Sequence, residues 1–223
     1  MLVHGHDAMK SMEEVRRLVS ANGWALLVTG GDQGPLATHL PCLLDPELDP
    51  GGGARDLVLI GHTARADPQS QRLHDGCEAL LVFQGPHGYI SPAWYESGPY
   101  VPTWNFTAVH VYGVPQLLEE DEGFAVLERT VEHFEAAREP PWRLGTSIDY
   151  ARRIASGTVP FRLAATRIEA KAKLSQDKPP EVQDRVIAAL EQPGPYHRPQ
   201  LAQEMRRVLG KRPTMEPTDG ASS

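Results

Sequence analysis

The 223-residue sequence predicts a mainly β protein, a small barrel of antiparallel strands with helices added to it. Three observations lead to this fold class. Apolar runs of strand length recur along the chain and are separated by short turns rich in Gly and Pro. Helices and strands do not alternate regularly, which argues against a parallel α/β sheet. Segments with helical periodicity stand near both ends of the chain and once between strands.

The first part of the chain combines one short helix with four strands. Val15, Leu18 and Val19 recur at helical spacing, with Glu and Arg at other positions of that segment. Two apolar runs flank the turn sequence at 30–34 and therefore predict a hairpin. In order, the sequence predicts a helix over 12–22, strands over 24–29, 36–44, 57–61 and 78–84, and an exposed loop over 45–55.

The second part of the chain predicts two more strands and three helices. Residues 104–112 alternate as strands do, and 114–118 continue that strand. An acidic run at 119–122 suits a helix N-terminus, because the helix dipole favours negative charge there. The apolar stripe of the helix that follows consists of Phe124, Leu127, Val131 and Phe134. The remaining expected elements are a strand over 161–170, helices over 182–190 and 201–209, and a frayed end from 213 onward.

Composition and charge exclude several classes of protein. No apolar run approaches the ~20 residues of a membrane span, and the first residues lack the pattern of a signal peptide. We therefore expect a cytoplasmic protein without a membrane segment. The formal net charge of −7 argues against a dedicated nucleic-acid-binding protein. Cys42 and Cys77 lie far apart and do not have the spacing of zinc ligands, so no metal site is predicted.

Standard catalytic signatures are absent from the sequence. It contains no G-x-S-x-G elbow, Walker loop, HExxH motif or Rossmann glycine pattern. The glycines at 51–53 precede a predicted strand instead of a helix, so they predict a plain loop and no phosphate site. The sequence therefore assigns no catalytic residue.

Three segments are unusually polar for their positions. They are residues 37–41 within an apolar strand, 61–68 directly after another strand, and 84–105, which is rich in aromatic residues. Thr hydroxyls, backbone amides and an Arg fork are groups that bind a phosphate, and the aromatic segment could cover a flat ring. Each segment also has a structural interpretation. A lone His within a strand, such as His39, is often a hydrogen-bonded core residue, and Arg65 can form a loop ion pair with Asp67. Aromatic loops rich in Pro often only close the end of a barrel.

Five motifs, in the order in which they occur along the chain, resemble those of the PaiB family. This family consists of FMN-binding proteins that are described as negative transcriptional regulators. The motifs are ATHLP at 37–41, GHTARADP at 61–68, FQGPHGYISPAWY at 83–95, VPTWN at 101–105 and KLSQ at 173–176. The similarity extends from about residue 15 to residue 209. It implies the FMN-binding split β-barrel with peripheral and C-terminal helices. It also implies a homodimer with a flavin at each end of the subunit interface.

The resemblance implies roles for individual residues. Arg65 and Thr63 would hold the flavin phosphate, with His62 beside them, and residues 38–41 would follow the edge of the isoalloxazine ring. Lys173 would help to close the site, from the same subunit or from its partner. The full implied cofactor set is Thr38, His39, Leu40, Pro41, His62, Thr63, Ala64, Arg65, Tyr89, Ser91, Trp94, Lys173, Ser175 and Gln176. Asp67 and Asp177 stand where the family usually has Asn, and such acids would weaken the binding of a phosphate.

The same resemblance divides the chain into three parts. Residues 1–178 would form the FMN-binding barrel domain with its inserted helices. Residues 179–212 would be a helical extension packed on the barrel or on the partner subunit, and 213–223 a disordered tail.

Three functions stay open at this point. The first is a flavin-linked negative transcriptional regulator. The second is an FMN-dependent oxidoreductase that uses NAD(P)H and an unknown small molecule, because flavin supplies hydride chemistry and the protein positions it. The third is a haem-binding split-barrel protein, which requires one His facing an apolar slot. The tail at 194–213 is locally basic, but direct DNA binding is not favoured, since the whole chain is acidic.

Overall fold

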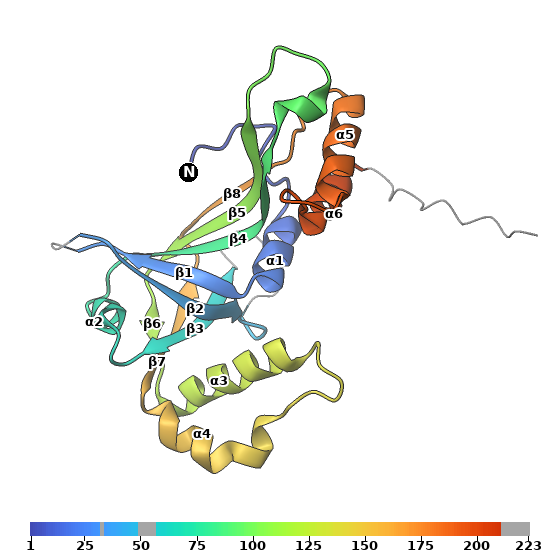
Figure 1. Ribbon diagram of the computed structural model, residues 1–223. Helices are drawn as coiled ribbons and strands as arrows, with labels where there is room; N and C mark the ends of the chain where they lie inside the picture. The colour runs from blue at the N-terminus through green and yellow to red at the C-terminus, as the bar shows by residue number, and fades with distance from the viewer. Residues whose placement is uncertain (32–33, 49–56, 211–223) are drawn as a thin grey trace, which may run out of the picture. The chain divides into compact units, whose positions relative to one another are not determined.

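The computed structural model describes residues 1–31, 34–48 and 57–210 (Figure 1). The predicted loop at 51–53 and the predicted disordered tail at 213–223 lie outside these residues, as do parts of the predicted turn at 30–34 and of the loop at 45–55.

The described residues form one eight-stranded antiparallel sheet and six α-helices. The strands are β1 (Trp24–Thr29), β2 (Leu36–Leu44), β3 (Val58–Ala64), β4 (Ala79–Ile90), β5 (Thr103–Gly113), β6 (Gln116–Leu117), β7 (Thr158–Ala164) and β8 (Arg167–Lys173). The helices are α1 (Met12–Ala21), α2 (Pro68–His74), α3 (Glu120–Glu135), α4 (Ile148–Ala155), α5 (Pro180–Glu191) and α6 (Pro199–Leu209), with short 3-10 helices η2 (Pro92–Tyr95) and η3 (Leu144–Ser147). The strand order is β6-β7-β3-β2-β1-β4-β5-β8, which confirms the predicted mainly β class with added helices.

The first helix and the hairpin form as their sequences predict. Ser11 caps α1, because its hydroxyl accepts a hydrogen bond from the Glu14 N–H at 3.2 Å. Strands β1 and β2 pair from Trp24 opposite Pro41 to Thr29 opposite Leu36. The alternation of side chains fixes this register, because a slip by one residue would exchange the core face of β2 with its opposite face.

The structure differs from the prediction in one divided strand and in two additional helices. The single strand expected over 161–170 is two strands, β7 and β8, and the chain changes partners between them. Ala165 donates its N–H to the Leu57 carbonyl, and Thr166 donates its N–H to the Tyr112 carbonyl. Helices α2 and α4 were not expected. They have seven and eight residues, and helices so short carry little periodic signal.

The contacts divide the chain into two compact units, which are described separately. Unit 1 consists mainly of residues 9–84 and 108–170, and unit 2 of residues 2–8, 85–107 and 171 onward. Strands β4, β5 and β8 pass from one unit into the other. The domain boundaries at 178 and 212 that the resemblance implies stay a prediction. None of the helices in the described residues combines the length and the apolar character that a membrane span requires.

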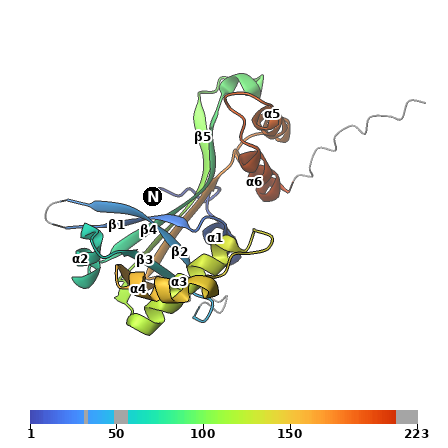
Figure 2. The ribbon, with the colours of Figure 1, turned by 60° about the horizontal axis from the view of Figure 1, so that its bottom comes forward.

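Unit 1 holds the main core and, on the other face of its strands, the helices α3 and α4. The core contains fully buried Leu27, Leu59 and Phe161. On the opposite face, Val126 of α3 packs with Leu43 of β2 and Ile60 of β3. Helices α3 and α4 lie side by side there (Figure 2). The sheet is therefore covered on a second face by an inserted helix pair.

Gly123 allows α3 to approach β7 closely. A Cβ atom at this position would lie 2.4 Å from Cγ of Pro160, far inside van der Waals contact. We expect Gly123→Ala to lower the free energy of unfolding by about 1–3 kcal/mol, as overpacking does. Urea denaturation measures this. The control is Gly145→Ala, since a Cβ there would have no neighbour within 4 Å, and equal stabilities of the two variants would contradict the close approach.

Candidate functional site

The polar runs on β2 and β3 divide their side chains between the two faces of the sheet. Leu40 and Thr63 are each only 2% exposed and point toward the core side. Pro41 and His62 face α3 and α4 instead, because successive side chains of a strand point to opposite faces. His39 is exposed and stacks on Trp24, with ring centroids 6.1 Å apart and planes inclined by 14°. Side chains of the run 38–41 therefore cannot all line one ligand.

An apolar pocket lies between β1–β3 and the helix pair. Its volume is about 480 Å³. Three of its large apolar residues are at least half exposed to solvent, namely Trp24 at 62%, Phe134 at 50% and Ile154 at 52%. The Thr130 hydroxyl in its wall donates to the Val126 carbonyl at 2.8 Å. The lining consists of Trp24, Pro41, His62, Leu127, Thr130, Val131, Phe134, Leu144, Ala151 and Ile154. We call this cavity the apolar pocket.

His62 lines the apolar pocket and carries a buried polar atom. Its Nδ1 is buried and has no hydrogen-bond partner among the residues that the structure describes. Burial lowers the pKa of His62 below its ordinary value of 6.5, because the charged imidazolium loses hydration. The ring is therefore neutral at neutral pH. A neutral imidazole with an unused nitrogen can donate one hydrogen bond to a ligand or accept one from it, depending on its tautomer.

The lowered pKa of His62 predicts a pH dependence of stability. Unfolding restores the ordinary pKa, so the unfolded chain binds more protons, and this contribution to stability is lost as the pH falls below about 6.5. We expect His62→Leu to lose less stability than the wild type between pH 7 and pH 5, as measured by urea denaturation across that range. The lowered pKa of His110 acts equally in both proteins. If the stabilities of the variant and of the wild type changed equally with pH, His62 would not be the group responsible for this pH dependence.

A second pocket of unit 1 contains Arg65. It has a volume of about 550 Å³, and Leu127 lines both this pocket and the apolar pocket, so the two are neighbours. It is called the Arg65 pocket below. Its lining also includes His74 and the acidic pair Glu119 and Glu120 at the start of α3. The Arg65 pocket thus combines an apolar lining with charged groups of both signs, whereas the first pocket is almost wholly apolar.

Arg65 is held in place by the backbone before β7. Its Nε donates to the Ser156 carbonyl at 2.7 Å and its Nη2 to the Thr158 carbonyl at 2.9 Å. The Arg65 N–H also bonds to the Gly157 carbonyl at 2.8 Å. A guanidinium has five N–H groups. Two are used here, so the fixed fork keeps donors for an anion.

Asp67 acts as the N-cap of α2, and not as the loop ion-pair partner of Arg65 that the sequence left open. Its Oδ1 accepts the Gln69 N–H at 2.8 Å, and both of its carboxylate oxygens accept the Thr38 hydroxyl, at 3.0 and 3.2 Å. The Thr38 hydroxyl is therefore already engaged. The Thr63 hydroxyl is buried without a partner in the described part of the chain.

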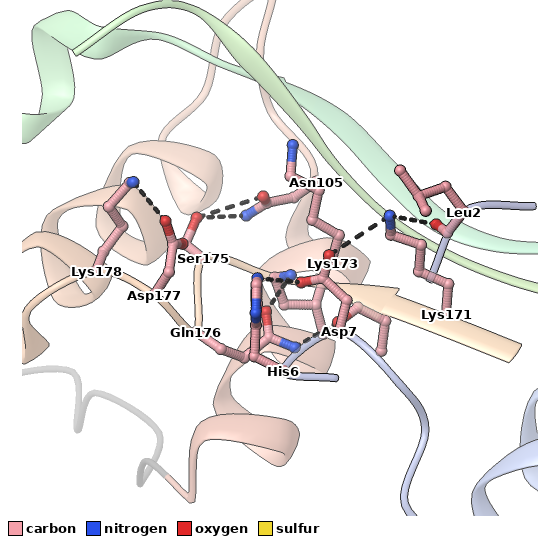
Figure 3. Close-up of polar contacts among 12 residues, drawn as sticks. Leu2, His6, Asp7, Asn105, Lys171, Lys173, Ser175, Gln176, Asp177 and Lys178 are labelled. Atoms are coloured by element: carbon pink, nitrogen blue, oxygen red, sulfur yellow. Dashed lines mark hydrogen bonds and ion pairs between the residues drawn. The ribbon is translucent and has the colours of Figure 1, made fainter. Parts of the chain in front are cut away.

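The implied residues at 173–176 lie in unit 2, where local contacts occupy them (Figure 3). Lys173 donates to the Thr103 hydroxyl. Ser175 is buried, adopts the left-handed region at φ 64°, and exchanges hydrogen bonds with the Asn105 amide at 2.9 and 3.3 Å. Gln176 bonds back to the main chain of Leu174 and Ala172. These contacts give the segment a structural role within unit 2, and its contribution to a cofactor site stays a prediction.

The remaining implied residues also belong to unit 2. Ser91 caps η2 by accepting the Ala93 N–H at 3.2 Å. Tyr89 stacks on Tyr196 at 5.6 Å between ring centroids, and Trp94 meets the same ring edge-on at 5.7 Å. The implied set is therefore split between the units, with residues 38–41 and 62–65 in unit 1 and the others in unit 2.

Sequence reasoning missed the helical side of the apolar pocket. Leu127, Val131 and Phe134 were recognised as an apolar stripe, but such a stripe predicts burial against a core and not a cavity wall. Ile154 comes from α4, which was not predicted at all. Phe134 is half exposed in the fold, and nothing in the sequence marks this difference from a core residue.

Comparisons with known proteins agree with the fold and the motifs. A family model described as "Putative FMN-binding domain" matches residues 1–167. The Bacillus subtilis protein "Protease synthase and sporulation protein PAI 2" is 34% identical over 215 residues, which cover 95% of this chain and 99% of that protein.

Two solved structures show the same fold at low sequence identity. The FAD and haem binding protein from Mycobacterium smegmatis matches with a TM-score of 0.59 and 16% identity, covering 82% of this chain and 80% of that chain. The flavocytochrome Anf3 from Azotobacter vinelandii matches with a TM-score of 0.53 and 15% identity, covering 74% and 68%. The chain therefore has the split-barrel fold and belongs to the PaiB family of proteins with a putative FMN-binding domain.

Proposed function

We propose that this protein binds FMN in unit 1, with the isoalloxazine ring in the apolar pocket and the phosphate at Arg65. One observation carries the proposal. Two neighbouring pockets that meet at Leu127 offer the two chemistries of FMN, an apolar slot for a ring and a fixed guanidinium for a phosphate. Family membership supports the same cofactor.

The residues fit the cofactor on three counts. The apolar pocket, at about 480 Å³, lies within the range of roughly 300–1,000 Å³ that is usual for small-molecule sites. His62 lines this pocket, and its unpartnered Nδ1 would offer one hydrogen bond to a polar edge of the ring. Arg65 supplies a charge-assisted donor, and Glu119 and Glu120 in the same pocket oppose the phosphate and moderate the affinity.

The protein's own groups would bind, orient and shield the ligand. The exposed faces of Trp24 and Phe134 offer apolar contact and would exclude water from a ring between the sheet and α3. The bound FMN would supply hydride and electron transfer. A neutral His62 keeps positive charge away from the ring region. No acid or base of this chain is assigned to a substrate.

We further propose that this protein is a homodimeric cytoplasmic regulator of transcription and that its flavin serves this regulatory role. The name of the B. subtilis relative, which refers to protease synthase and sporulation, supports regulation. The net charge of −7 favours regulation without tight direct DNA contact. A gel-shift titration at low and high salt tests this point, because a tight, salt-sensitive complex would contradict it. Reduction of the bound flavin by NAD(P)H would favour the oxidoreductase alternative instead.

Haem is a second candidate ligand, for one specific reason. Among the residues that line the apolar pocket, His62 is the one histidine, so the pocket presents a single imidazole in an apolar slot. The two structural neighbours are described as a FAD and haem binding protein and as a flavocytochrome.

The absorption spectrum of the purified protein tests both ligands. Two flavin bands, together with FMN identified chromatographically after release, would support the proposal. A Soret band would instead identify haem as the bound ligand and contradict the proposal of FMN. Protein that is purified colourless is then titrated with FMN, and a lack of binding would overturn the proposed function. Light scattering on the same sample gives the oligomeric state, and a monomer would contradict the homodimer.

A further inference from the structure

A third pocket lies wholly within unit 2 and is separate from the proposed FMN residues of unit 1. It has a volume of about 420 Å³ and lies between η2, helix α5 and the loop that joins α5 to α6. Trp94 and the half-exposed Tyr196 form an aromatic wall, and Ala188 and Ala189 of α5 provide small apolar side chains. Such a cavity has room and apolar surface for a flat ring. It is called the α5 pocket below.

Arg185 brings a positive charge to the α5 pocket. Its Nη2 donates to the Tyr95 carbonyl, which holds the guanidinium in one place. Its Nε is buried and makes no hydrogen bond within the described ranges, and the carboxylate of Glu96 lies 3.8 Å away, too far for a hydrogen bond. Glu96 itself is mostly exposed, at 71% of its side chain. The guanidinium is thus fixed but incompletely paired.

The segment beside Arg185 carries two further features that are costly unless they have a use. Glu96 adopts the left-handed region at φ 48°, which residues other than glycine seldom occupy. The phenol oxygen of Tyr95 is buried without a partner in the described part of the chain. Strained backbone and unpaired buried polar atoms gather at ligand sites more often than elsewhere. Of the two residues, Glu96 lines the α5 pocket and Tyr95 does not, so the cavity, Arg185 and Glu96 together indicate a binding site.

We propose that the α5 pocket binds a small aromatic carboxylate, with its carboxylate on Arg185 and its ring against Trp94 and Tyr196. A planar carboxylate matches the donor geometry of a guanidinium, and a charge-assisted pair of this kind is stronger than a neutral hydrogen bond. A bound carboxylate would compete with Glu96 for Arg185. Every group that the site uses belongs to unit 2, and none of them lines the two pockets proposed for FMN.

Calorimetric titration of the full-length protein tests the site with indole-3-acetate and its neutral amide, indole-3-acetamide. We expect the carboxylate to bind about tenfold more tightly than the amide, since only the carboxylate pairs with Arg185. Arg185→Gln should remove this preference. Arg198→Gln is the matched control, because Arg198 is an exposed arginine of unit 2 that does not line the pocket. It should bind both probes as the wild type does.

Glu96→Gln keeps the proposal testable if Arg185→Gln does not fold, because Glu96 is exposed at the surface. Removal of the competing carboxylate should tighten binding of indole-3-acetate by about two- to fivefold and leave the amide unchanged. Equal affinity for both probes, an unchanged preference in Arg185→Gln, or weaker carboxylate binding in Glu96→Gln would each overturn the proposal. The absence of binding by either probe would overturn it as well.

Discussion

Arg65→Ala is expected to weaken FMN binding about ten- to a hundredfold while riboflavin binding stays within about twofold. The change removes a charge-assisted contact to the phosphate that contributes roughly 1.5–3 kcal/mol. Riboflavin lacks the phosphate and depends on the ring pocket alone, at Pro41, His62 and the helix pair. Fluorescence titration of the apoprotein with each ligand measures both affinities.

Controls for this prediction are needed because Arg65 also supports the backbone at Ser156 and Thr158. Thermal unfolding of Arg65→Ala shows whether that support matters, and Arg65→Lys keeps the charge while it removes the fork. Arg153→Ala is the matched exposed arginine of unit 1, since it lines neither pocket and lies over the Tyr150 ring. Equal losses for FMN and riboflavin would make Arg65 a structural residue and contradict its assignment to the phosphate.

Asp45→Asn is expected to lower the free energy of unfolding by about 2–3 kcal/mol, at or just below the lower end of the range for breaking a buried ion pair. The Asp45 side chain is fully buried. It accepts a hydrogen bond from Nε of Arg162 on β7 at 2.9 Å, and Nη1 of Arg129 on α3 lies 3.5 Å away. Both arginines keep some contact with water, which limits the loss.

The same substitution should also weaken FMN binding, because Asp45 connects α3 to β7 and α3 lines both pockets. Urea denaturation and FMN titration of one preparation measure the two effects. Glu122→Gln is the control, since Glu122 is exposed and lies 3.4 Å from Nη1 of Arg162. It should change stability by less than about 1 kcal/mol. If the two variants were equally stable, Asp45 would not be the anchor of α3.

Local patterns were sufficient for the elements that depend on neighbours in sequence. The hairpin of β1 and β2 was predicted with its bounds at 24–29 and 36–44, because turn residues and alternation both act over a few residues. The break between β7 and β8 was not predicted. It depends on hydrogen bonds from Ala165 to Leu57 and from Thr166 to Tyr112, and such distant partners leave no periodic trace.

The candidate site shows the same division. The motifs identified Pro41, His62 and Arg65 as candidates, and the structure places Pro41 and His62 in one pocket and Arg65 in its neighbour. The motifs also grouped Leu40 with Pro41, although the two side chains lie on opposite faces of β2. A contiguous motif marks a segment, whereas the pleat of the strand decides which of its side chains can reach a ligand.

The sequence by itself determined the mainly β class, the hairpin, the amphipathic helices and the family to which the chain belongs. These follow from short-range patterning and from motifs that are readable in order. Only the tertiary structure decided that the apolar stripe of α3 lines a cavity, and that Asp67 caps α2. It also decided that Arg185 stands incompletely paired beside Trp94. The physical reason is that a side chain's role depends on which distant segment packs against it, and apolar character alone is the same in a core and in a pocket wall.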